Sequence, residues 1–149
     1  MPGTVRALFV KPEKGATQVP LASVEATPTG FGGDYHSARM ARRQVLLISG
    51  HVLNELDVEP GVIDENVVVD DLDVMSLTEG QQLRLGEALV AVTTPCEPCL
   101  QMDRIRHGLK EALKGRRGMF VKVVSPGAVR VGDSVVLIDQ EPPAEDSPD

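Results

Sequence analysis

The sequence predicts a mostly β fold, a barrel or sandwich with one main helix, and three observations support this class. Apolar residues occur in short Val, Leu and Ile runs broken by Gly, Pro and Asp, which is typical of strands with tight connections. Only one long segment has the apolar periodicity of a helix. The 149 residues are 42% hydrophobic and 25% charged, which is sufficient for one core without disulfide bonds.

Short apolar runs predict nine strands. These are Val5–Val10, Leu21–Ala26, Arg43–Ile48, Asn66–Val69, Gln82–Leu85, Leu89–Thr93, Met119–Val124, Ala128–Val131 and Val135–Ile138. Two connections, Leu83–Leu89 and Val129–Val135, look alike because each places Gly and an acidic residue between alternating apolar runs. Gly accepts a positive φ at no steric cost, so we expect both to be hairpin turns.

Two segments predict helices. Ser49 is expected to cap a short helix through Leu56 that stops at Pro60-Gly61. The main helix is expected from about Leu100 to Lys114, with Gly115 as its C-terminal stop. Its apolar residues recur at spacings of three and four and form one stripe: Met102, Ile105, Leu109, Ala112 and Leu113.

The domain organisation and compartment follow from the two ends of the chain. Residues 1–138 are expected to form one domain, and residues 139–149, with five acids and three prolines, an acidic disordered tail. The first ten residues lack the sustained apolar segment of a signal peptide, and no run approaches the roughly 18 apolar residues of a membrane-spanning helix. We therefore expect a cytoplasmic protein in a reducing compartment, without membrane contact.

The charge balance opposes nucleic-acid binding. The chain has 15 basic and 22 acidic residues, a formal net charge of -7, and only 3% aromatic residues for base stacking. The segment Arg104–Arg117 reverses this balance with six basic residues and one acidic residue. A small basic segment on an acidic protein favours one anionic small molecule as its ligand. The alternative is a solvated helix face without a ligand.

The most informative segment holds two cysteines, Cys96 and Cys99, where a predicted strand ends and the main helix begins. The helix dipole and nearby basic residues are expected to lower the pKa of the Cys99 thiol and favour its thiolate. A zinc site needs two further ligands, and the three histidines have no paired spacing. The remaining alternatives are a thioredoxin-like dithiol, a persulfide carrier, a metal-bound thiolate, and two buried structural thiols.

Several segments in order resemble the MOSC domain, the module named for the C-terminal part of molybdenum cofactor sulfurases, which also occurs as small stand-alone proteins. The resemblance covers roughly residues 3 to 138. It is carried by Gly33-Asp34-Tyr35-His36, the run from Arg43 to Ser49, Glu65-Asn66-Val67, the turn from Leu77 to Gly80, Leu85-Gly86-Glu87-Ala88, Pro98-Cys99, the run from Gly115 to Val123, and the run from Pro126 to Val135. It departs from the family where Val67 replaces Leu and where Cys96 precedes the Pro-Cys site.

The resemblance implies a MOSC-like β-barrel that binds the molybdenum cofactor, molybdopterin. It makes Cys99 the metal ligand or the carrier of a persulfide, and some relatives reduce N-hydroxylated substrates with electrons from a separate donor. Cys96 is then expected to resolve a persulfide on Cys99 or to be idle. Pyridoxal phosphate is not expected, because 149 residues leave no room for the domain that binds it.

The other candidate site residues are assigned by their chemistry. Arg116 and Arg117, helped by Lys122, are expected to hold the anionic pterin phosphate. Asp34 and His36 lie in a Gly-rich loop, and His36 is a candidate proton donor or an ordinary surface histidine. Glu65 and Asn66 are expected to contact the pterin or to hold their loop by hydrogen bonds. For Arg42 and Arg43, beside a predicted strand, the sequence leaves two alternatives open: contact with an anion, or a place on the outer face.

The expected function is therefore cofactor binding through Cys99, with reduction of an N-hydroxylated substrate as one activity. The alternatives are a non-catalytic sulfur or cofactor carrier and a CxxC dithiol oxidoreductase. Expected partners are the anionic pterin and either a separate electron donor or a cysteine desulfurase, with no nucleic acid and no membrane. The chain is expected to be a monomer or a homodimer.

Overall fold

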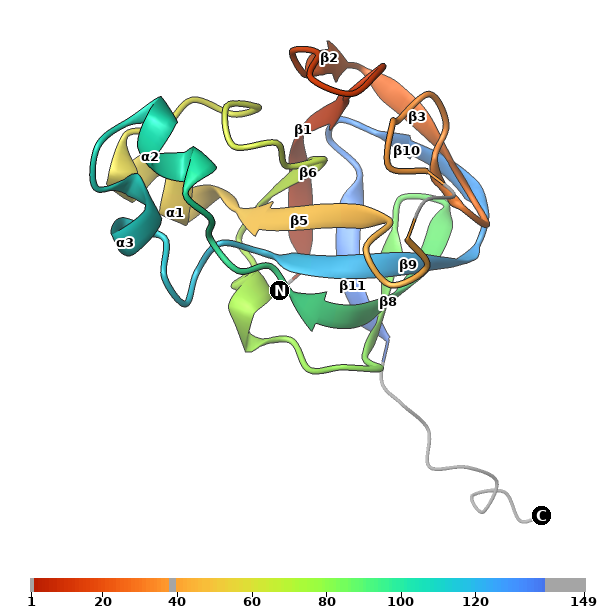
Figure 1. Cartoon of the computed structure of the whole chain (residues 1–149). Helices are drawn as coiled ribbons and strands as arrows, with labels where there is room; N and C mark the ends of the chain where they lie inside the picture. The colour runs from red at the N-terminus through yellow and green to blue at the C-terminus, as the bar shows by residue number, and fades with distance from the viewer. Residues whose placement is uncertain (1, 38–39, 139–149) are drawn as a thin grey trace, which may run out of the picture.

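The computed structural model describes residues 2–37 and 40–138 and confirms the mostly β class. The main sheet consists of β1 (Gly3–Val10), β2 (Val19–Leu21), β5 (Val45–Ser49), β6 (Val67–Asp70), β7 (Gln82–Leu85), β8 (Ala88–Pro95), β9 (Met119–Ser125) and β11 (Ser134–Ile138). Its order is β11-β7-β8-β9-β5-β6-β1-β2, and β11 also pairs with β1, so seven strands close into a barrel (Figure 1). All pairings in it are antiparallel except that of β5 with β6.

A second, three-stranded sheet contains β3 (Ser23–Thr27), β4 (Gly30–Phe31) and β10 (Gly127–Arg130), in the order β10-β3-β4. The single strand expected over 21–26 is therefore wrong, because the chain leaves the barrel sheet after Leu21 and enters the second sheet at Ser23. The first expected hairpin is confirmed: β7 and β8 pair directly, with Gly86 at φ 60°. The second is wrong, since β10 pairs with β3 whereas β11 pairs with β7 and β1. Its turn bonds to β1, where the N–H of Gly132 donates to the carbonyl of Val5 at 2.8 Å.

Alternate residues of β5 join two separate cores, as the period of a strand requires. Val45 and Leu47 belong to the core inside the barrel, and Ile48 belongs to a second core under the helices. A parallel strand buried on both faces reads as a continuous apolar run, which explains Val-Leu-Leu-Ile in this strand. The second core contains Phe9, Ile48, Val52, Leu53, Ile63, Val68, Met102, Leu109 and Leu113.

Three short helices lie together at the end of the molecule where β5 leaves the barrel: α1 (Gly50–Leu56), α2 (Gln101–Ile105) and α3 (Leu109–Ala112) (Figure 1). The single helix expected over 100–114 is wrong, because this segment forms two separate helices, α2 and α3. Arg106 is extended (φ -158°, ψ 131°) and Gly108 has φ 87°, which ends one helix and starts the next. The guanidinium of Arg106 donates to the carbonyls of Leu56 and Asp57 at the end of α1, which stabilises the break.

The short helix expected after Ser49 is confirmed, and Ser49 is its N-cap residue, but its side chain makes no capping hydrogen bond. Ser49 precedes α1, but its hydroxyl donates to the carbonyl of Leu72 and accepts from the N–H of Val74, both at 2.8 Å. The helix ends at Leu56, ahead of the expected stop, because Asp57 adopts the left-handed conformation. A 3-10 turn, η1, spans Val74–Ser76.

The tail expected over 139–149 lies outside the described residues. Within residues 2–37 and 40–138, none of the helices has the length and apolar character needed to span a membrane.

Candidate functional site

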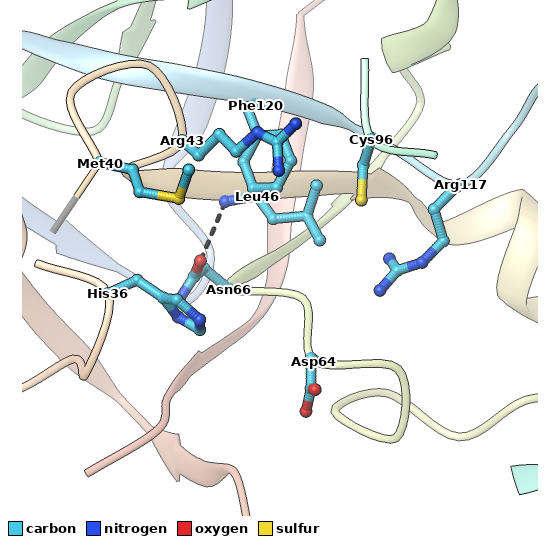
Figure 2. Close-up of a pocket in the computed structure, with 9 residues that line it drawn as sticks. All are labelled: His36, Met40, Arg43, Leu46, Asp64, Asn66, Cys96, Arg117 and Phe120. Carbon is cyan, nitrogen blue, oxygen red and sulfur yellow. Dashed lines mark hydrogen bonds between the residues drawn. The ribbon is translucent and has the colours of Figure 1, made fainter. Parts of the chain in front are cut away.

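A pocket opens on the outer wall of the barrel, where the loop after β8 lies beside β5 and β9. Its volume of about 200 Å³ is smaller than the roughly 300–1,000 Å³ of typical small-molecule sites. The residues that line it come from separate segments of the chain (Figure 2): His36, Met40, Arg43, Leu46, Asp64, Asn66, Cys96, Arg117 and Phe120. Four of the candidate site residues are thus brought together here: His36, Asn66, Cys96 and Arg117.

Cys96 supplies the thiol of this pocket. Its backbone N–H donates to the carbonyl of Gly118 at 2.9 Å, which fixes the loop against the start of β9. Figure 2 shows the sulfur pointing into the pocket, on the side of Arg117. Burial raises the pKa of the Cys96 thiol, and the charges of Arg117 and Arg43 oppose this shift. The pocket therefore holds a shielded thiol next to two cations.

The backbone contact of Cys96 depends on a glycine at position 118. Gly118 has φ 132°, a conformation that side-chain-bearing residues rarely adopt. A Cβ atom there would lie 2.5 Å from the carbonyl oxygen of Leu47. The chain can approach β5 this closely only because residue 118 has no side chain.

Arg117 is the buried cation of the pocket, with only 5% of its surface exposed. Its Nη2 donates to the carbonyl of Ile63 at 2.5 Å. Its Nη1 is buried without a hydrogen-bond partner among the described residues. Because an unpaired buried donor costs free energy, this atom favours a ligand that can accept a hydrogen bond.

Glu65 stands in the chain between the lining residues Asp64 and Asn66 and is fully buried. Its Oε2 accepts from the N–H of Gly61 at 2.6 Å, while its Oε1 has no partner within the described part of the chain. Burial raises the pKa of this carboxyl, against the opposing effects of the Gly61 hydrogen bond and the charge of Arg117. Glu65 and Arg117 thus both anchor the loop that carries Asp64.

Asn66 lines the pocket but its amide is already committed to the fold. Its Oδ1 accepts from the N–H of Leu46 at 2.9 Å (Figure 2), and its Nδ2 donates to the carbonyl of Phe9 at 3.0 Å. The residue therefore connects β5 to β1.

His36 and Asp34 form a pair at the other end of the pocket. The Asp34 side chain is fully buried, and its Oδ1 accepts from the N–H of Lys11 at 2.8 Å. Its Oδ2 lies 3.6 Å from Nδ1 of His36 and has no hydrogen-bond partner among residues 2–37 and 40–138. The His36 side chain is 44% exposed and lines the pocket, so it is accessible both to solvent and to a bound ligand.

Arg43 provides the second cation, with its guanidinium 5.7 Å from the ring centroid of Phe120. Arg42 turns away and donates to Glu79 at 2.9 Å and to the carbonyl of Thr93 at 3.0 Å. Sequence reasoning left Arg43 undecided and missed four lining residues: Met40, Leu46, Asp64 and Phe120. The alternation of β5 and β9 could have placed Leu46 and Phe120 on the outer face, but no local signal marks Met40 or Asp64.

Besides Asp34 and Glu65, three further candidate residues are absent from the pocket lining. Cys99 is exposed, so the alternative of two buried structural thiols does not hold for it. Arg116 donates to Glu55 at 2.5 Å and to the carbonyl of Ala112 at 2.9 Å. Lys122 is exposed on β9, opposite Ala91 of β8. The basic segment is therefore divided, and only Arg117 from it reaches the pocket.

The site combines a thiol, two guanidinium groups and a histidine, a set suited to an anionic ligand with a soft atom. Across the described residues, no three His, Cys, Asp or Glu side chains are grouped so that they could hold a metal ion. A metal in this pocket would have to bring most of its ligands with it.

Comparisons with known proteins agree with this architecture. The family model of the MOSC domain matches residues 34–136. Among solved structures, the YuaD protein from Bacillus subtilis superposes with a TM-score of 0.80 and 22% identity, covering 94% of this chain and 98% of that one. YiiM from Geobacillus stearothermophilus has a TM-score of 0.78 and 18% identity, with 93% and 76% covered. YiiM from Escherichia coli has a TM-score of 0.69 and 23% identity, with 95% and 71% covered. No curated protein matches the chain.

Proposed function

The chain belongs to the MOSC domain family, and we propose that it binds a molybdenum cofactor of the molybdopterin type in the pocket beside Cys96. The family is linked to this cofactor. The observation that carries the proposal is the buried Arg117, whose Nη1 lacks a partner among the described residues in a pocket that also contains a thiol.

The residues present fit the charged part of such a cofactor. A phosphate accepts hydrogen bonds from guanidinium groups in a bidentate geometry, and it would satisfy Nη1 of Arg117. Arg43 adds a second guanidinium on the same pocket. When bound, the cofactor would supply two-electron redox chemistry at a metal that binds soft thiolates. The loop 96–99 is proposed to provide one thiolate ligand, with Cys99 favoured by the family resemblance and Cys96 by its position in the pocket.

The proposed activity is reduction of an N-hydroxylated base or amidoxime. Removal of the oxygen atom as water consumes two electrons and two protons, and a separate partner would supply the electrons. His36 is proposed to deliver a proton at its imidazole, with Asp34 holding the ring from behind. The alternatives are a carrier that holds sulfur or cofactor without turnover and a dithiol oxidoreductase that uses both cysteines.

The test is metal analysis together with pterin fluorescence after oxidative release, on protein from a host that makes the cofactor. Wild type is compared with Cys96→Ser and Cys99→Ser. Near-stoichiometric molybdenum and pterin in wild type, lost in one cysteine variant, would support the proposal and identify the ligand. Their absence from the wild type would reject it. A dithiol oxidoreductase would lose its activity in both cysteine variants. A protein in which one cysteine ligates the metal would lose molybdenum in only one of them.

A further inference from the structure

A larger hollow adjoins the pocket that contains Cys96. It is a groove between the loop that joins β1 to β2 and the loop that precedes β6. Its volume is about 590 Å³, against about 200 Å³ for the pocket, and lies within the roughly 300–1,000 Å³ of small-molecule sites. Asp64 lines both hollows. The pocket is too small for a cofactor together with a whole substrate, whereas the groove has room for the part of a substrate that does not react.

Contacts between the two loops hold the groove in shape. Nζ of Lys11 donates to the carbonyl of Ala16 at 2.9 Å and lies 3.1 Å from Oδ1 of Asp64. The side chain of Gln18 is buried, and its Nε2 donates to the carbonyl of Glu65 at 2.6 Å. Because both sides of the groove are fixed before a ligand arrives, binding costs little ordering of the loops.

The two hollows differ in charge. The pocket lining has two guanidinium groups, those of Arg43 and Arg117, and one carboxylate, that of Asp64. As far as the structure describes the chain, the charged side chains of the groove lining are Lys11 and Asp64, which form an ion pair. An ion in the groove would lose water without gaining an unpaired opposite charge. The pocket therefore favours an anion, and the groove favours an uncharged ligand.

The rest of the groove suits a flat ring with a polar edge. Its apolar surface comes from four residues: Phe9, Pro20, Pro60 and Val62. Gln101 adds a side-chain amide to the lining. The Asp64 side chain is 31% exposed, and its carboxylate has lone pairs beyond the one used by Lys11, so it can accept a hydrogen bond from a ligand N–H.

We propose that this groove holds the uncharged, flat ring of the substrate, and that the Lys11–Asp64 pair selects against charged substrates. An N–H group on the ring's polar edge donates to Asp64, and the apolar side of the ring packs against Val62. This deepens the proposed function and rests on it, because the reacting N-hydroxyl group extends past Asp64 into the pocket beside Cys96.

The experiment is an NMR titration of full-length, ¹⁵N-labelled protein from a host that cannot make molybdopterin. The probes are benzamide, benzamidine and benzoate, which share a ring and a planar substituent but are uncharged, positive and negative. A ligand of this size and ordinary efficiency binds with a Kd of about 10 mM or less. Shifts of the backbone N–H signals and of the Gln18 and Gln101 side-chain amides locate the site.

Three variants accompany the wild type. Val62→Ser removes apolar surface from the groove, and its matched control is Val124→Ser on β9, because the two valines are 42% and 45% exposed and Val124 lies outside the groove lining. Asp64→Asn leaves Lys11 without its ion-pair partner, and asparagine tolerates the left-handed backbone of residue 64, which has φ 65°. The dispersion of each spectrum establishes that the variant is folded.

We expect benzamide to shift the signals of groove residues to saturation, with a Kd roughly 5-fold or more below those of both ions. Val62→Ser weakens benzamide binding by roughly 3-fold or more, whereas Val124→Ser leaves it unchanged. Asp64→Asn raises the affinity for benzoate relative to benzamide by roughly 3-fold or more, because the ammonium of Lys11 is then unpaired.

Three results would overturn the proposal: no saturable shifts at about 10 mM benzamide, shifts confined to residues outside the groove, or tighter binding of either ion to the wild type. Equal effects of Val62→Ser and Val124→Ser would do the same. Since no cofactor is present, a failure here leaves the molybdenum and pterin test of the proposed function unaffected. Failure of that test, with benzamide still bound in the groove, would reject the proposed function alone.

Discussion

Arg117 and Ile63 are 54 positions apart in the chain, yet Nη2 of the arginine donates to the carbonyl of Ile63 at 2.5 Å. This bond joins the segment before β9 to the loop before β6 and holds one side of the pocket against the other. The two ends of the same guanidinium group therefore differ, since Nη2 holds the loop while Nη1 has no hydrogen-bond partner among the described residues.

Arg117→Lys is expected to lower the molybdenum and pterin content of protein from a cofactor-producing host. Lysine keeps the charge but loses the planar fork, and one hydrogen bond to a charged group is worth about 1.5–3 kcal/mol, or roughly 10–100-fold in affinity. The matched control is Arg116→Lys, because Arg116 bonds to Glu55 outside the pocket. Equal cofactor loss in the two variants would contradict the assignment of the anion to Arg117.

His36→Asn is expected to reduce turnover of an N-hydroxylated substrate by about 10²-fold or more while cofactor content stays near that of wild type. The reason is that His36 lines the pocket, where it is proposed to act as the proton donor. The measurement is steady-state kinetics with an artificial electron donor on protein normalised to molybdenum. Unchanged turnover would make His36 an ordinary surface histidine.

Asn66→Ala is expected to destabilise the fold by about 2–4 kcal/mol, since the variant leaves the N–H of Leu46 and the carbonyl of Phe9 buried without their amide partner. Urea denaturation measures the loss. Asn54→Ala, which removes an exposed hydrogen bond from Arg6, should cost less than about 1 kcal/mol. If Asn66→Ala were as stable as this control, the bridging role of Asn66 would be wrong.

Gly118→Ala is expected to cost about 2–5 kcal/mol of stability, because it adds left-handed backbone strain and a clash with the carbonyl of Leu47. Gly115→Ala is the matched control. Gly115 also has a positive φ, but nothing lies within 4 Å of the added Cβ, so only the strain of about 1–2 kcal/mol applies. Thermal unfolding distinguishes the two, and similar losses would show that the approach to β5 tolerates a methyl group.

Glu65→Gln is expected to flatten the dependence of stability on pH. Burial raises the pKa of Glu65 in the folded protein, so between the unfolded and folded pKa values the folded state retains a proton that the unfolded chain has released. The free energy of unfolding therefore falls as pH rises through this window, and the glutamine variant lacks that fall.

Urea denaturation of wild type and Glu65→Gln from about pH 4 to pH 8 tests this, because titrations shared by both proteins cancel in the difference. Glu87→Gln gives the opposite sign, since the hydrogen bond from Arg130 lowers the pKa of Glu87 and stabilises the fold as pH rises. If the free energy of unfolding of wild type minus that of Glu65→Gln rose with pH, Glu65 would not be a buried carboxyl that retains its proton in the folded state.

The barrel strands could be predicted because their signal is local. The run Gln82–Leu85 alternates apolar and polar residues, and its ends match β7. The helix over 100–114 was predicted too long because Met102, Leu109 and Leu113 keep a helical spacing even though Gly108 reverses the backbone between them. Periodicity reports which residues are buried, and it does not report a break stabilised by Arg106 reaching a distant helix.

The site was predictable in its chemistry and only partly in its members. The two cysteines are three positions apart, and sequence alone could not say which one faces a pocket, because that depends on the bond between Cys96 and Gly118. Arg116 and Arg117 are adjacent and chemically equal, yet one bonds to Glu55 on α1 and the other is buried. In each pair, contacts with residues distant in the chain give the two members different surroundings, and these contacts cannot be read from the sequence.

The pairing of β1 with β11 has a consequence for how the protein folds. Among the residues that the structure describes, two pairs form this seam, Gly3 with Val135 and Thr4 with Ser134, and each joins the first strand to the last. Contacts so distant along the chain form late and slow the search for the native topology, typically to milliseconds or seconds for barrels of this kind. During synthesis the barrel cannot close until β11 has left the ribosome, so the edges of β1 and β7 wait unpaired and exposed to aggregation until then.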